Sequence, residues 1–304
     1  MSAPAMGGRS AAGRVISPEG SAPPALADRQ PRGPIALLIS DIDGTLVTPA
    51  KTLTPAAAAA VRRLAAAGIG FTLVSSRPPR GMTALVAQLG VRLPFGAFNG
   101  GSLVAPDLSL IIAHRLSPDV ARRVLALFTA RGVGVWVFAD GDWLTRDPRG
   151  ANVARERRAI GFAPKVVDGF AEVMDRIDKI VGVSDDLALV GRVEADAQVL
   201  VGDAAAIRVS QPGHLDVTHP QANKGEAVSA LSGRIGVDLR RVAAIGDSFN
   251  DVPMFARAGF SIAMGQGPAE VRAQASAVTL SNAQDGFAHA VAHFILPYAA
   301  VAGT

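Results

Sequence analysis

The chain is poor in side chains that titrate or cross-link. Its 304 residues include no cysteine, one tyrosine and five histidines, and only four of its 30 cationic residues are lysines. The absence of cysteine excludes disulfides, iron–sulfur clusters, cysteine-ligated zinc and a thiol nucleophile. The pI of about 10.1 follows from the same scarcity. Cationic residues, mostly arginine, slightly outnumber acidic ones, and because few groups titrate near neutrality this small excess is enough to raise the pI.

Long apolar runs and basic runs are also lacking. No stretch of ~18 uncharged apolar residues exists, so we expect no transmembrane helix. Acidic residues are interleaved with the basic ones and aromatic residues make up 5%, which predicts no nucleic-acid partner. Residues 1–34 hold six prolines and five glycines without a continuous apolar segment, which predicts a disordered extension rather than a secretory signal. We therefore expect a cytoplasmic protein.

Apolar strands and amphipathic helices alternate at both ends of the ordered chain. Ile35–Ser40 is a short apolar run that predicts a strand buried on both faces. Thr54 and Pro55 are typical of a helix N-cap and its first residue, and Phe71–Val74 predicts a second strand. The same alternation returns between residues 223 and 294. Such βαβ units predict a doubly wound parallel sheet.

The middle of the chain has a different pattern and interrupts the sheet. Residues 102–219 mix strand and helix signals, among them a helix signal over Phe170–Arg176, and they are numerous enough for a domain of their own. The fold class predicted is therefore α/β. Its core domain is discontinuous, with segments 35–101 and 220–297, and a mixed α/β domain is inserted at 102–219.

Polar residues follow the predicted strands of the core. Because ligands bind at the carboxyl ends of strands in open α/β sheets, these residues are candidates for one shared site. They are Asp41, Asp43, Ser75, Asn99, Gly100, Asp247, Asn250 and Asp251, with Lys224 at the start of a helix.

These residue types suit phosphoryl transfer. Three converging carboxylates, Asp41, Asp43 and Asp247, would repel one another unless a cation lay among them, and oxygen ligands without cysteine or histidine favour Mg²⁺. A carboxylate is a competent nucleophile towards phosphorus, and a second one can serve as general acid and base. The Ser75 hydroxyl and the Lys224 ammonium can hold phosphoryl oxygens.

Four motifs in order make the sequence resemble the haloacid dehalogenase (HAD) superfamily. Asp41-Ile-Asp43-Gly-Thr45 matches the first motif, Ser75 replaces the threonine or serine of the second, Lys224-Gly225 matches the third, and Gly246-Asp247-Ser-Phe-Asn250-Asp251 the fourth. The Asn99-Gly100 pair is similar to that of the Cof-like phosphatases, subfamily IIB. The resemblance spans about residues 35–294 and implies a Rossmann-like core with an inserted cap domain.

The resemblance also implies a role for each matching residue. Asp41 would be the nucleophile and a Mg²⁺ ligand, Asp43 the general acid and base whose backbone carbonyl also binds Mg²⁺, and Asp247 the third protein ligand. Contacts to the phosphoryl group would come from Ser75, Lys224, Asn250, Asn99 and Gly100. Asp251 would support the metal or Lys224 from behind.

Some residues depart from this pattern or lie outside it. Ser76 stands where the family usually has glycine, which predicts a less adaptable loop. A pair spaced four residues apart, His289 and His293, has metal-ligand spacing but no third ligand in the sequence. Three residues of the insert are candidates either for a substrate pocket or for packing, and His219 for a structural role; the three are Trp136, Asp140 and Trp143.

The predicted function is a Mg²⁺-dependent phosphatase that acts on a small phosphorylated metabolite through an aspartyl-phosphate on Asp41. The resemblance favours a sugar phosphate, with flavin mononucleotide, pyridoxal phosphate and nucleotide phosphates left open. A phosphomutase of the same family and a phosphate-sensing module without turnover are the alternatives. The sequence leaves monomer and dimer open and predicts no membrane partner.

Overall fold

A five-stranded parallel sheet forms the centre of the larger lobe. The structure, a computed structural model, describes residues 30–149 and 151–300, so the predicted N-terminal extension lies almost wholly outside the described residues. The strand order is β14-β13-β12-β1-β2, and every neighbouring pair runs parallel. The strands are β1 (Leu37–Ser40), β2 (Gly70–Leu73), β12 (Val242–Gly246), β13 (Phe260–Ala263) and β14 (Ala277–Val278).

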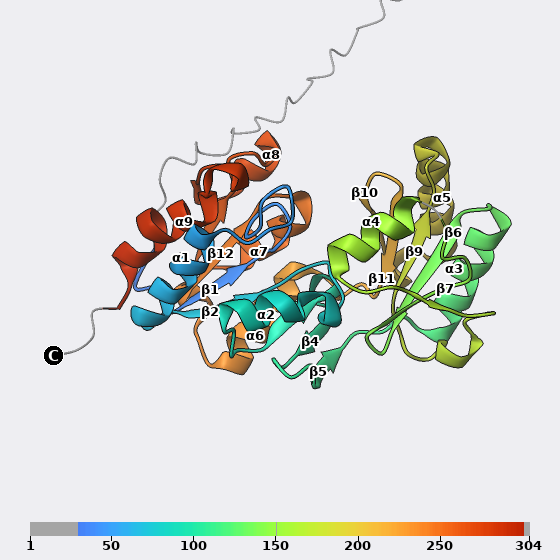
Figure 1. The fold of residues 1–304 in the computed structure, drawn as a ribbon, viewed down its shortest axis with the longest axis horizontal. Coiled ribbons are helices and arrows are strands. Elements are labelled where there is room, and N and C mark those ends of the chain that lie inside the picture. The colour runs from blue at the N-terminus through green and yellow to red at the C-terminus, as the bar shows by residue number, and fades with distance from the viewer. Residues whose placement is uncertain (1–29, 150, 301–304) are drawn as a thin grey trace, which may run out of the picture.

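Helices cover both faces of this sheet, as Figure 1 shows. Alternate residues of β1 point to opposite faces, so Leu38 joins the apolar cluster of α1 and α9. Leu37 and Ile39 join the cluster of α6 and α7. The helices of this lobe are α1 (Pro55–Ala66), α2 (Thr83–Leu89), α6 (Lys224–Ile235), α7 (Val252–Arg257), α8 (Ala269–Arg272) and α9 (Gly286–Ala290).

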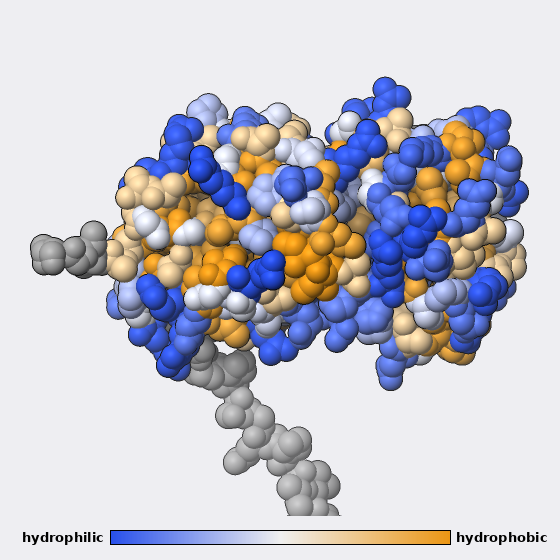
Figure 2. Space-filling model, turned by 90° about the horizontal axis from the view of Figure 1, so that it is seen from below, coloured by the Kyte–Doolittle hydropathy of each residue, from blue (hydrophilic) through white to orange (hydrophobic). Residues whose placement is uncertain are grey.

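A small antiparallel sheet extends this lobe. It consists of β3 (Phe95–Ala97), β4 (Ser102–Val104) and β5 (Leu110–Ala113) in that order. A parallel bridge between Val74 and Gly96 links it to the end of β2. The four residues of β5 are apolar; Leu110 is exposed and the other three are partly buried. Apolar side chains gather over the middle of the face seen from below (Figure 2).

The second lobe contains a six-stranded sheet in the order β10-β11-β9-β6-β7-β8. Only β7 and β8 are parallel within it. Helices α3 (Pro118–Ala130) and α5 (Leu187–Val201) pack on one face. Helix α4 (Ala151–Ile160) shares an apolar cluster with the larger lobe (Figure 1). The strands are β6 (Gly134–Ala139), β7 (Asp142–Thr145), β8 (Lys165–Val166), β9 (Ile177–Val183), β10 (Ala206–Gln211) and β11 (His214–Thr218).

The predicted fold class is confirmed: a parallel α/β sheet whose strands come from both ends of the chain, with a mixed sheet formed from the segment between them. The domain boundaries at 101/102 and 219/220 stay a prediction. The helix signal over Phe170–Arg176 yields only a 3₁₀ turn, Ala171–Val173, since the chain enters the central strand β9 at Ile177. No helix among the described residues is long and apolar enough to cross a membrane.

Candidate active site

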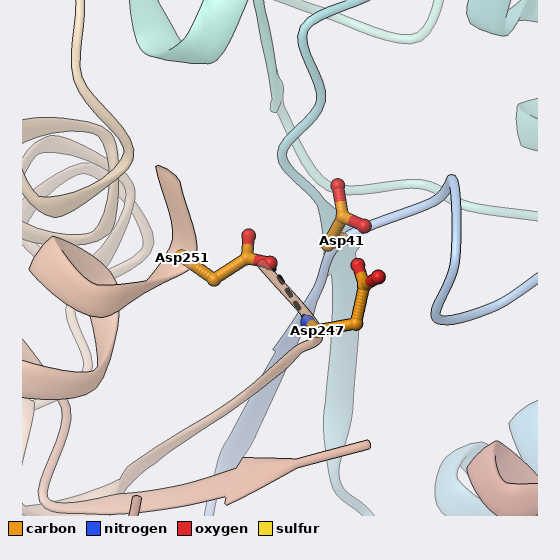
Figure 3. Close-up of side chains that lie close together, drawn as sticks. All are labelled: Asp41, Asp247 and Asp251. Atoms are coloured by element: carbon orange, nitrogen blue, oxygen red, sulfur yellow. Dashed lines mark hydrogen bonds between the residues drawn. The ribbon is translucent and has the colours of Figure 1, made fainter. Parts of the chain in front are cut away.

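Two neighbouring strands, β1 and β12, bring three carboxylates together at their carboxyl ends. Ser40 lies opposite Ile245 in the parallel ladder, so Asp41 and Asp247 follow directly at the same edge. With Asp251, each offers one carboxylate oxygen, and these oxygens lie within 4.8 Å of one another (Figure 3). Asp41 is 4% exposed and Asp251 fully buried. Such an all-oxygen cluster can hold a hard divalent cation.

Lys224 places a positive charge inside this cluster. Its Nζ donates hydrogen bonds to Asp41 Oδ1 and Asp251 Oδ1, each at 2.6 Å, and the residue is 1% exposed. Lys224 is the first residue of α6, and the Asn223 side chain caps that helix by accepting from Glu226 N. The helix start therefore fixes where the ammonium emerges, and one buried cation faces three buried or half-buried acids.

Both carboxylate oxygens of Asp251 accept hydrogen bonds from groups of the protein. Its Oδ2 accepts from the backbone nitrogens of Asp247 and Ser248 at 2.8 and 2.9 Å, while Oδ1 accepts from Lys224. Gly246 leaves room for this contact, because a Cβ there would lie 2.4 Å from Asp251 Cγ. Asp251 thus ties the loop after β12 to Lys224.

The pKa values of Asp41 and Asp247 indicate that the cluster can accommodate an additional cation. Burial raises the pKa of Asp41 above its ordinary value, Lys224 opposes the rise, and the charges of Asp251 and Asp247 add to it. Burial, together with the Asp251 charge, raises the pKa of Asp247 to about 6. Burial and mutual repulsion thus disfavour the charged forms of Asp41 and Asp247, and a metal ion between them would favour those forms.

Asp43 points to a different set of partners. Its carboxylate accepts from Arg77 Nε and Nη2 at 2.7 Å each, and from Lys51 Nζ at 2.8 Å. Burial by itself would raise the pKa of Asp43, but the hydrogen bonds and charges of Arg77 and Lys51 outweigh it and lower the pKa to about 2. Asp43 is therefore ionised in this arrangement.

The loops after β2 and β3 supply the remaining predicted residues. Ser75 is buried and its Oγ accepts from Arg77 N at 3.2 Å. Asn99, at φ +57°, accepts at Oδ1 from Asn250 Nδ2 at 3.2 Å. This contact joins the loop after β3 to the loop after β12, so two distant motifs meet at one edge.

Two loop positions show what the backbone requires here. Gly100 has φ +92°, and a Cβ there would lie 2.5 Å from Ala227 Cβ, so only glycine lets this loop pack on α6. Ser76 is absent from the residues with positive φ among those described. The serine that replaces the usual glycine therefore adopts an ordinary backbone conformation, and the predicted stiffening costs no strain.

The candidates in the inserted segment serve packing and ion pairs. Trp136 and Trp143 are buried and contact each other edge to face, with ring centroids 5.0 Å apart. Asp140 accepts from Arg115 at 2.7 Å and from Arg176 at 2.6 Å. The two tryptophans belong to the apolar cluster that includes α4 and the larger lobe, so they pack on that side of the inserted sheet.

The histidine candidates have local partners. His289 Nδ1 lies 2.9 Å from Thr279 Oγ1, and His293 Nδ1 lies 3.0 Å from the carbonyl of His289. His219 stacks on His114 with centroids 5.4 Å apart. In the described part of the chain, the acidic cluster is the one group arranged for a metal ion, and it contains no histidine.

Sequence reasoning assigned no role to four residues around the site. Arg77 and Lys51 hold Asp43, and Thr45 Oγ1 donates to Asp247 Oδ1 at 3.4 Å. Glu156 of α4 lies near Lys179, Asp43 and Arg77, and burial raises its pKa. The position of Arg77 after a predicted strand could have indicated a role. The sequence gives no such indication for Lys51 and Glu156, because only tertiary contacts bring them close to Asp43.

Known proteins are similar to this chain in sequence and in fold. The sequence profile of the haloacid dehalogenase-like hydrolases matches residues 38–291. An HMP-PP phosphatase of Cronobacter sakazakii is 30% identical over 234 residues, which cover 77% of this chain and 85% of that protein. A haloacid dehalogenase-like hydrolase of Bacteroides thetaiotaomicron superposes with a TM-score of 0.79 at 24% identity, covering 85% of this chain and 98% of that one.

A sugar phosphatase of HAD subclass IIB superposes with a TM-score of 0.76 at 20% identity, covering 86% of this chain and 99% of that one. The profile match spans most of the chain and includes every residue of the acidic cluster. The chain therefore belongs to the haloacid dehalogenase-like hydrolases, in their Cof-like phosphatase subfamily.

Proposed function

We propose that the protein is a Mg²⁺-dependent phosphatase that hydrolyses a small phosphorylated metabolite through an aspartyl-phosphate on Asp41. The observation that carries this proposal is the buried contact of Lys224 with Asp41 at 2.6 Å, at the carboxyl edge of the parallel sheet. A carboxylate held beside a fixed ammonium is placed to attack phosphorus while the ammonium attracts the phosphoryl oxygens.

Asp41 and Asp247, with the backbone carbonyl of Asp43, would hold the metal. Lys224 occupies one oxygen of Asp41, and Thr45 one oxygen of Asp247, while both oxygens of Asp251 are engaged by donors of the protein. Asp251 therefore acts as a positioning residue for Lys224. When bound, Mg²⁺ supplies positive charge that offsets the carboxylates and the transferred phosphoryl group.

In the first half of the reaction, an Asp41 oxygen forms a bond to phosphorus as the bond to the leaving oxygen breaks. The leaving oxygen takes a proton from Asp43. Asp43 must therefore enter this step protonated and turned away from Arg77 and Lys51, since both stabilise its carboxylate. In the second half, water attacks the phosphorus of the aspartyl-phosphate and Asp43 accepts a proton from the water. The bond between phosphorus and the Asp41 oxygen breaks, which releases phosphate and restores the Asp41 carboxylate. The Ser75 hydroxyl and Lys224 would hold the phosphoryl oxygens in both halves.

The leaving group would meet the inserted sheet. Phe98, next to Asn99, packs against Phe138 of β6 with ring centroids 5.7 Å apart. The sheet face that carries Phe138 therefore lies against the loop after β3, which holds Asn99. A sugar phosphate is the substrate favoured by the family resemblance, and the name of the relative at 30% identity adds HMP-PP as a candidate.

A panel of phosphorylated metabolites, scored for phosphate release with and without Mg²⁺, tests the proposal. The wild type should release phosphate from at least one compound only when Mg²⁺ is present, and Asp41→Asn should release none. Loss of phosphate release in Asp41→Asn together with retained folding by circular dichroism supports Asp41 as nucleophile. Equal release by the two proteins would refute it.

A further inference from the structure

A cleft beside Asp43 separates the larger lobe from the end of α4. Its volume is about 580 Å³. One wall comes from residues 51–53 and from positions between 77 and 88, and the other from residues 158–162. Arg80 and Phe162 meet across it, with the guanidinium carbon 4.6 Å from the ring centroid. The cleft thus lies between the two lobes, next to the proposed catalytic acid.

Four cations line this cleft, and its lining residues include no aspartate or glutamate. They are Lys51, Arg77, Arg80 and Arg158. Asp43 does not line the cleft itself but pairs with two of the lining cations, Lys51 and Arg77. Acids outside the lining also act on these cations: Asp43 on Lys51 and Arg77, Asp142 on Arg80, and Glu156 on Arg77. Four cations against three acids still leave the cleft with an excess of positive charge.

The two outer cations are weakly compensated. Arg80 lies 4.0 Å from the nearest Asp142 oxygen, the limit of an ion pair. Arg158 has no ion pair with any described residue, and it lies in the last turn of α4. A concave surface with uncompensated arginines attracts anions, and guanidinium groups match the geometry of phosphate and carboxylate oxygens.

We propose that this cleft binds a second anionic group of the substrate, a phosphate or a carboxylate, while the scissile phosphate lies at Asp41. This inference rests on the proposed function, because it extends the same site towards the leaving group. Preferred substrates would therefore carry two anionic groups joined by a short spacer. Arg80 and Arg158 hold the second group, and Lys51 and Arg77 lie between it and the reaction centre.

Matched pairs of simple phosphates test the proposal on the full chain. Monophosphates and bisphosphates of 1,n-alkanediols, with two to six carbons, differ only in the second anionic group and its distance. At low ionic strength with Mg²⁺, the best bisphosphate should exceed its monophosphate in kcat/KM by about tenfold, well above the twofold expected from two equivalent phosphates. Added salt should reduce the preference.

Variants of neighbouring arginines separate a specific site from general charge. Arg158→Gln should lower the ratio of bisphosphate to monophosphate kcat/KM by about tenfold, because a charge-assisted hydrogen bond is lost. Arg157→Gln removes the same charge one residue earlier on α4, outside the cleft lining, and should leave the ratio unchanged. Arg80→Gln should lower the ratio as Arg158→Gln does.

Equal kcat/KM for mono- and bisphosphates, or equal ratios for the Arg157→Gln and Arg158→Gln proteins, would overturn the inference. Calorimetric titration of Asp41→Asn with the same pairs distinguishes this failure from failure of the proposed function. Suppose that no compound is hydrolysed, that the bisphosphate binds about tenfold more tightly than the monophosphate, and that Arg158→Gln removes this difference. The anion site in the cleft would then be supported and the proposed phosphatase activity refuted. Hydrolysis without any preference gives the opposite result.

Discussion

The guanidinium of Arg77 donates to both carboxylate oxygens of Asp43, from Nε and Nη2, at 2.7 Å each. This two-point contact aligns the carboxylate as well as stabilising its charge. Lys51 adds a third bond at 2.8 Å. The proposed general acid and base is therefore held by groups from two separate loops, and the balance between its two protonation states depends on them.

Replacing Arg77 should make the stability of the protein less dependent on acid pH. The pKa of Asp43 is lowered to about 2 in the folded state, from an ordinary 3.8. Its contribution is therefore present above pH 4 and is lost as the pH falls towards 2. Arg77→Gln should lower the free energy of unfolding by roughly 2 kcal/mol at pH 7 and by much less near pH 2.5. Urea denaturation at both pH values measures this difference.

The exposed Arg62 on α1 provides the matched control, because Arg62→Gln removes an arginine without touching Asp43. Its cost should be within about 0.5 kcal/mol at both pH values. A constant cost for Arg77→Gln across the pH range would show that Arg77 acts by packing alone.

Replacing Lys224 should destabilise the fold as well as stop turnover. Lys224→Met leaves Asp41 and Asp251 buried without their shared cation. Removal of one partner from a buried ion pair costs about 3–5 kcal/mol. Thermal denaturation should show this loss, whereas Lys165→Met, at an exposed ion pair with Asp142, should change stability by less than about 1 kcal/mol. Equal effects of the two substitutions would contradict the assigned contact.

A methyl group at Gly44 should disturb the metal site more than the fold. Gly44 has φ +89°, and a Cβ there would lie 2.3 Å from Asp247 Oδ2. Gly68 has φ +71° with open space around it, so Gly68→Ala reports the backbone cost alone, about 1 kcal/mol. Gly44→Ala should cost more stability than Gly68→Ala and reduce activity by at least about tenfold. Comparable activity in the two variants would show that Asp247 can move freely.

Magnesium should stabilise the wild type through the acidic cluster. At a concentration 100 times its dissociation constant, a bound ion adds about 2.7 kcal/mol to the free energy of unfolding. Removal with a chelator should reverse the rise in Tm. Because the pKa of Asp247 is raised to about 6, protons compete with the ion below that pH, and the Mg²⁺-induced shift should shrink as the pH falls from 7 to 5. Asp247→Asn should remove most of the shift at every pH.

The edge of the parallel sheet was predictable because its signals are local. The apolar run that became β1 ends at Asp41, and Thr54 caps α1 by accepting from Ala57 N at 3.0 Å, as expected. The roles of Asp41 and Lys224 remain predictions, but their contact follows from topology: both lie at the carboxyl edge of one sheet.

The parts that sequence reasoning missed depend on distant contacts. Short strands such as β7 and β8 carry little periodic signal, and neighbouring strands decide whether they form. Lys51 lies in a loop, and nothing in its neighbourhood along the chain indicates that it reaches Asp43. The cationic cleft likewise combines segments about a hundred residues apart, so no motif contains it.

The discontinuous sheet has a consequence for synthesis on the ribosome. The strand that bears Asp41 must pair with β12, and the Asp41–Lys224 contact joins residues 183 positions apart. Until the last third of the chain has emerged, one edge of β1 has no partner. By contrast, every strand between residues 118 and 218 pairs only with strands of that same segment. We expect the inserted lobe to fold first and the reaction centre to close last, as the final step of a slow, long-range assembly.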